Sequence, residues 1–131
     1  MTEAQRRQRA AAYEQTLETL NAKAAELEKD MEELEALAGK FSGLQDRLAL
    51  RKSERMAVLG TIGGICHVKS ARVYHQGMSE LAGGPDYGAV YGGLSDAIDK
   101  IYQEISSIRQ QLSSCEYEIG CCKAGLKSLT Q

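Results

Sequence analysis

The fold is decided by the stretch from Tyr87 to Leu129, YGAVYGGLSDAIDKIYQEISSIRQQLSSCEYEIGCCKAGLKSL. Its apolar side chains recur at alternating spacings of four and three residues, and no polar residue interrupts the series. This spacing lines one face of an α-helix, whereas strand side chains alternate every two residues. Pro85 and Asp86 precede the series and suit a first helical turn. The sequence therefore predicts a long helix over residues 85–129.

A second series with the same spacing runs from Ala10 to Leu48, with Gln45 as its polar exception, and then lapses. It predicts a helix over about residues 3–59. Two matching apolar stripes are typical of helices that pack along a common seam. The residues expected in this seam are Tyr13, Leu17, Leu20, Leu27, Met31, Leu34, Phe41, Leu94, Ile98, Ile101, Ile105, Ile108, Leu112 and Ile119.

Glycines occur within both predicted helices and in the segment between them. Those inside the helices indicate close helix approach or a local kink, with a break as the alternative; they are Gly39, Gly43, Gly92, Gly93 and Gly120. Two further clusters bracket a short amphipathic piece within residues 60–84; they are Gly60, Gly63 and Gly64, then Gly83 and Gly84. These clusters predict bends on either side of a short helix.

Register favours one arrangement of these pieces. If the long helices pack antiparallel, Ala10 faces Leu129 and Leu48 faces Tyr91, which places the midpoint near residue 70. We expect an all-α fold with one domain, residues 1–131: a long two-helix hairpin with a short helical cap at its tip. The alternative is one turn at residues 60–65 followed by a kinked second helix.

Composition excludes several classes of function. The chain carries 16 basic and 18 acidic side chains, so a nucleic-acid footprint is not expected. No segment approaches the ~18 continuous apolar residues of a membrane span. The N-terminus, MTEAQRRQRAAAYEQ, lacks the apolar run of a secretory signal. We expect a protein made in the cytoplasm, whose export would use a route that needs no signal peptide.

The stretch GGICHVKSARVYHQGM, residues 63–78, contains the side chains that would be candidates for phosphate binding, metal binding or catalysis. Val68 stands where a phosphate-binding loop needs its second glycine, and no strand precedes it. His67 and His75 are too far apart along a helix to share a zinc ion easily. Adjacent Cys66 and His67 point about 100° apart on a helix, which does not suit a nucleophile pair. We expect no catalytic residue, no metal and no cofactor.

The remaining cysteines follow the helical pattern. Cys115 and Cys122 fall in the seam, where free cysteine acts as a small apolar residue. Cys121 falls outside the seam and is the thiol expected to be most reactive. A metal- or thiol-responsive sensor that uses Cys66 with these three is the alternative.

The tip sequence HVKSARVYHQGMSEL and the helix YGAVYGGLSDAIDKIYQEISSIRQQLSSCEYEI resemble those of small helical-hairpin proteins of bacterial type VII secretion, the Trp-X-Gly (ESAT-like) group. More closely, the chain resembles accessory proteins encoded beside LXG-domain polymorphic toxins. It departs from the Trp-X-Gly pattern because it has no Trp, and Tyr102 and Tyr117 lack an acidic residue four positions on.

The resemblance implies a non-enzymatic helper, a chaperone or targeting factor, that binds the helical LXG region of a toxin and assists its export. A second small helical protein would complete the bundle. The side chains beside the seam that we expect at the partner interface are Leu37, Leu44, Leu50, Val90, Tyr102 and Tyr117. A structural coiled-coil scaffold or self-dimerising subunit is the rival interpretation.

Overall fold

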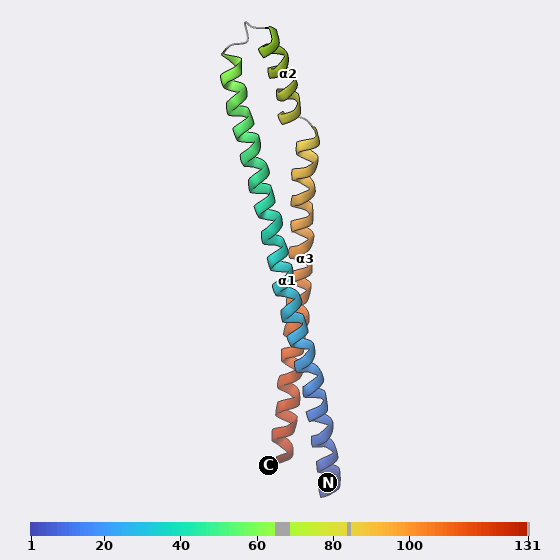
Figure 1. The fold of residues 1–131 in the computed structure, drawn as a ribbon. Coiled ribbons are helices and arrows are strands. Elements are labelled where there is room, and N and C mark those ends of the chain that lie inside the picture. Colours follow the sequence, from blue (N-terminus) through green and yellow to red (C-terminus); the bar gives the residue numbers. More distant parts are fainter. Residues whose placement is uncertain (65–68, 84, 131) are drawn as a thin grey trace. The chain divides into compact units, whose positions relative to one another are not determined.

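The computed structural model describes residues 1–64, 69–83 and 85–130. It contains three α-helices in order, α1 (Glu3–Gly63), α2 (Lys69–Gly83) and α3 (Pro85–Thr130) (Figure 1). Apart from Met1, Thr2 and Gly64, every described residue is helical, which confirms the all-α prediction. Helix α1 ends at Gly63 and not near residue 59, so residues 60–63 belong to α1 and not to the tip.

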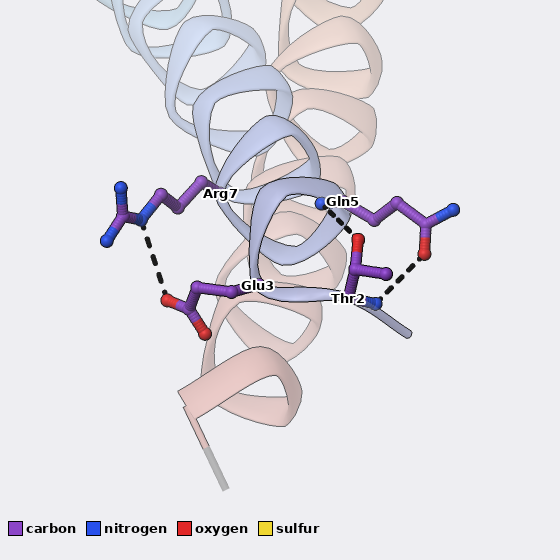
Figure 2. Close-up of polar contacts among 4 residues, drawn as sticks. All are labelled: Thr2, Glu3, Gln5 and Arg7. Carbon is purple, nitrogen blue, oxygen red and sulfur yellow. Dashed lines mark hydrogen bonds and ion pairs between the residues drawn. The ribbon is translucent and has the colours of Figure 1, made fainter.

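Helix α1 begins with a reciprocal capping interaction (Figure 2). The backbone N–H of Gln5 donates to Thr2 Oγ1 at 3.2 Å, and the backbone N–H of Thr2 donates to Gln5 Oε1 at 3.0 Å. This capping box satisfies amide groups that have no partner inside the helix. Arg7 Nε lies 3.5 Å from Glu3 Oε1, one turn apart on an exposed face, where such a pair contributes little. The cap fixes the first helical residue.

The chain packs as two compact units. Unit 1 comprises Met1–Glu35 and Tyr102–Gln131, and unit 2 comprises Ala36–Ile101. In unit 1, the start of α1 packs against the end of α3 through an apolar core. The buried members of this core are Leu20, Leu27, Ile108, Leu112, Cys115 and Cys122, and the partly buried residues Tyr13, Leu17, Ala24, Met31, Leu34 and Ile119 pack against them.

Contacts in unit 1 define an antiparallel register. Arg109 Nη2 lies 3.7 Å from Glu35 Oε1, and both side chains are largely exposed. At the other end, the ring of Tyr13 lies over Gly125, where an added Cβ would be 2.6 Å from Tyr13 Cζ. The members of each pair are equidistant from a point near residue 70, as the spacing of the two apolar series predicts.

The same register holds in unit 2, where polar groups enter the seam. The amide Nε2 of Gln45 donates to Ser95 Oγ at 2.7 Å and to the Tyr91 carbonyl oxygen at 3.2 Å. Lys52 Nζ lies 4.4 Å from the centre of the Tyr87 ring, which itself stacks on Tyr91 at 6.0 Å. Gln45 and Lys52, which interrupt the apolar series in the sequence, are therefore accommodated by specific partners.

Helix α2 lies beside the last turns of α1, within unit 2 (Figure 1). His75 Nε2 is 3.4 Å from the position that a Cβ on Gly63 would take. Of the two arrangements expected for the tip, these contacts match the alternative, in which the second arm is a broken helix that returns along α1. Residues 65–68 and 84, which include Cys66, His67 and Val68, lie outside the described residues.

Most helix-interior glycines do not mark close packing. A Cβ added at Gly39, Gly43, Gly92, Gly93 or Gly120 would meet nothing within 4 Å, and α1 and α3 continue through all of them. The expectation of close helix approach at these positions is therefore wrong, because their α-carbons face open space. Close approach occurs instead at Gly125, which the sequence pattern did not single out.

The Gln45–Ser95 hydrogen bond is expected to show measurable coupling. Because this part-buried bond joins two helices, Gln45→Ala and Ser95→Ala should interact by about 1 kcal/mol in a double-mutant cycle of urea unfolding. Gln111 Nε2 and Ser107 Oγ, 3.5 Å apart and exposed on α3, provide the matched control pair. That control cycle should give a coupling near zero. Equal coupling in the two cycles would contradict the seam role of Gln45.

Candidate interaction surface

The groups with metal-binding or nucleophilic chemistry do not converge in the described part of the chain. His75 is half-buried on α2 against the end of α1, while Cys66 and His67 lie outside the described residues. Within residues 1–64, 69–83 and 85–130, no three His, Cys, Asp or Glu side chains are grouped to hold a metal ion. Over these same ranges, no polar or charged residue is buried.

The three described cysteines are free thiols in two different environments. Cys115 and Cys122 are buried in the core of unit 1, with Cys115 only 2% exposed. Cys121 is exposed on α3. The two buried thiols therefore fill space in the seam, while Cys121 lies on the surface away from it.

The predicted seam residues all lie at the contact between helices. Ile101, Ile105, Ile108, Leu112, Leu20 and Leu27 are buried, and Ile105 is 1% exposed. The rest of the set is half-buried; it consists of Tyr13, Leu17, Met31, Leu34, Phe41, Leu94, Ile98 and Ile119. Within unit 2, Leu59 and Ala38 occupy a positions and are each 2% exposed. The seam occupies positions a and d of a heptad, so every other residue can be given a heptad position.

The predicted partner-interface residues are all exposed, but they do not share one side of the helices. Leu37 and Leu44 of α1 and Val90 of α3 occupy g positions and are 39%, 43% and 54% exposed. Tyr102 occupies an e position, and Leu50 and Tyr117 occupy f positions that point away from the seam. In this antiparallel register e faces e, as the Glu35–Arg109 pair shows, and g faces g. The set is thus divided among three heptad positions, e, f and g.

Val58 adds a further member to the g side of unit 2. It is 54% exposed and lies two heptads beyond Leu44, with Arg51 between them in the same row. The interface prediction omitted Val58, although its position in the heptad could have identified it. The g side of unit 2 thus carries exposed apolar side chains on both α1 and α3.

A hollow of about 310 Å³ opens beside Val58. Its lining comes from the end of α1 and from α2, and consists of Glu54, Arg55, Val58, Leu59, Tyr74 and Met78. Among these lining residues, Tyr74 is half exposed and Leu59 is buried. A second hollow, lined by Met1, Gln5, Gln8, Arg9 and Ala12, lies along the first turns of α1 alone and is more polar. The hollow beside Val58 therefore extends the apolar g side toward the tip.

Comparison of the chain with protein-family models, curated proteins and solved structures found no match. None of the helices, over their described residues, is both long and apolar enough to cross a membrane.

Proposed function

We propose that this protein is a non-enzymatic helical partner that binds the helical LXG region of a type VII secreted toxin and assists its export. The observation that carries the proposal is the exposure of large apolar side chains beside the seam. Two helices bury only the stripe that each presents to the other, and packed bundle helices bury a wider face. Leu44 and Val90, exposed in the isolated chain, would be covered in a larger bundle.

The type of partner comes from the resemblance of the tip and the last helix to type VII hairpin proteins. A helical target suits this surface because an amphipathic helix lays its apolar face into a groove between other helices. A second small helical protein would complete the bundle and supply the export signal. This arrangement requires no chemical step by the chain itself.

Light scattering coupled to size-exclusion chromatography tests the proposal. The chain is purified alone and after co-expression with the products of adjacent genes. We expect a stoichiometric complex with an LXG-domain protein, and self-association or marginal stability of the chain alone. A monomer that remains monomeric at high concentration and captures none of those products would contradict the proposal. A stable homodimer that captures none of them would favour the self-dimerising scaffold.

A further inference from the structure

The g side of unit 2 has a defined apolar centre. The name Leu44 surface is used here for Leu37, Leu44 and Val58 of α1 together with Val90 of α3. All four side chains are at least 39% exposed. Leu37 and Val58 are 21 residues apart on one helix, a distance of about 32 Å at ~1.5 Å per residue. A partner helix of about six turns would cover this length.

The charges beside the Leu44 surface are mostly basic. Arg51 lies in the same row of α1, and Lys40, Arg47 and Lys100 occupy the neighbouring c positions, all of them exposed. Glu54 and Asp86 are the acidic exceptions within unit 2, and both lie nearer the α2 end of the surface. At the other end, Glu33 lies one turn before Leu37 on α1. Long basic side chains at the edge of an apolar stripe favour a partner that carries carboxylates there, and repel one that carries lysines.

The e side of unit 2, opposite the Leu44 surface, differs from it in apolar character and in charge. Its e positions are Ser42, Ala49 and Met56 on α1 and Gly88 and Ser95 on α3. The b positions beside them include Asp46 and Asp99. Apart from Met56, which is 48% exposed, the e side offers small side chains, and its margin is acidic. An acidic helix would therefore be attracted to the Leu44 surface and repelled from the e side.

We propose that the Leu44 surface docks an amphipathic helix of a partner protein whose apolar stripe is flanked by acidic side chains. This inference rests on the proposed function and specifies the side of the protein and the chemistry of the helix. The apolar stripe of that helix covers Leu37, Leu44 and Val90, and its carboxylates pair with Arg47 and Arg51. A large apolar side chain at its end enters the hollow between Val58, Tyr74 and Met78.

Two synthetic helical peptides of about 21 residues test the charge preference. They share one leucine stripe and differ only in glutamates or lysines at the flanking positions. The full-length protein is expected to bind the glutamate peptide at least about tenfold more tightly at low salt, and the difference should shrink as salt screens the charges. Equal affinity for the two peptides, or binding of neither, would overturn the proposal.

Substitutions then locate the binding surface. Leu44→Glu should weaken binding of the glutamate peptide at least about tenfold. Leu50→Glu is the matched control, because Leu50 is on the same helix and is more exposed but occupies an f position; it should bind like the wild type. The double variant Arg47→Glu/Arg51→Glu should reverse the preference toward the lysine peptide. Circular dichroism confirms that each variant remains helical.

Two outcomes separate this inference from the proposed function. If Leu44→Glu captures the co-expressed LXG-domain protein as well as the wild type does, the partner binds elsewhere and the Leu44 surface proposal fails while the function stands. If the wild type is a stable dimer that captures no co-expressed protein and Leu44→Glu is a monomer, a second copy covers the surface. Its carboxylates would then come from residues 26–35, which carry six acidic side chains. That result would also overturn the proposal of a different partner protein.

Discussion

The Ile105→Asp variant is expected to lose the cooperative thermal unfolding transition of the wild-type chain. Ile105 is 1% exposed, among the most deeply buried large side chains described in unit 1. Replacing it removes about 2–5 kcal/mol of packing and also buries a carboxylate without a partner, which adds several kcal/mol. The sum approaches the whole stability of a small domain, about 5–15 kcal/mol. The measurement is circular dichroism at 222 nm during heating.

Ser106→Asp provides the matched control for this prediction. Ser106 is the next residue on α3 and is exposed, so its aspartate remains hydrated and should change the free energy of unfolding by no more than about 0.5 kcal/mol. Ile105→Val should fall between the two, with a loss of about 0.5–1.5 kcal/mol. An unchanged melting curve for Ile105→Asp would show that this face of α3 is exposed and the register of the hairpin wrong.

Leucine at Gly125 is expected to destabilise the chain, although glycine is a poor helix former. A Cβ at this position would lie 2.6 Å from Tyr13 Cζ and 2.9 Å from the Tyr13 hydroxyl oxygen, so the ring must move out of its place beside α3. Overpacking of this kind costs about 1–3 kcal/mol, more than the ~1 kcal/mol gained by removing a helical glycine. Urea unfolding of Gly125→Leu measures the net loss.

Gly120→Leu makes the comparison decisive, since it places the same side chain in the same helix. Nothing lies within 4 Å of a Cβ at Gly120, and the residue is exposed. This variant should therefore gain up to about 1 kcal/mol from helix propensity alone. Similar effects of the two substitutions would argue against close packing of Tyr13 on Gly125. Tyr13→Ala in the Gly125→Leu background should relieve part of the loss.

The helices and their register could be predicted from the sequence because one physical rule governs both. Burial of one helical stripe requires the alternating spacing of four and three residues, and two such stripes fix which ends meet. The tip could not be assigned in the same way. Glycine clusters at residues 60–64 and 83–84 are compatible with a cap or with a broken second helix. Contacts of His75 with Gly63 decide between them, and these depend on three-dimensional packing.

The contacts of glycine and polar residues within the helices could not be predicted from the sequence. The series marks Gln45 as a polar exception, but its partner Ser95 follows only from the register at single-residue accuracy. Similarly, a glycine in a helix signals either close approach or open space, and the choice depends on the facing side chain. Gly125 lies against a tyrosine ring, whereas Gly120 lies against nothing.

The candidate surface was predicted in part. Exposure of the apolar residues beside the seam follows from the heptad, because positions outside a and d have no partner in a two-helix packing. Their division into separate sides also follows from the heptad, and it separates Leu44 and Val90 from Tyr102. The hollow beside Val58 could not be foreseen, since it forms only where α2 returns along α1.

The polar contacts of unit 2 have a consequence for how the arms find one another during folding. Two helices with uniform aliphatic stripes can slide by seven residues and still bury leucine against isoleucine, so a slipped hairpin would be a competing product. A slip of seven residues separates Gln45 from Ser95 and breaks this part-buried hydrogen bond, which costs about 1 kcal/mol. Lys52 would lose the Tyr87 ring in the same step. These two interruptions of the apolar series therefore destabilise slipped pairings of α1 with α3 in unit 2 and favour the register that the structure shows.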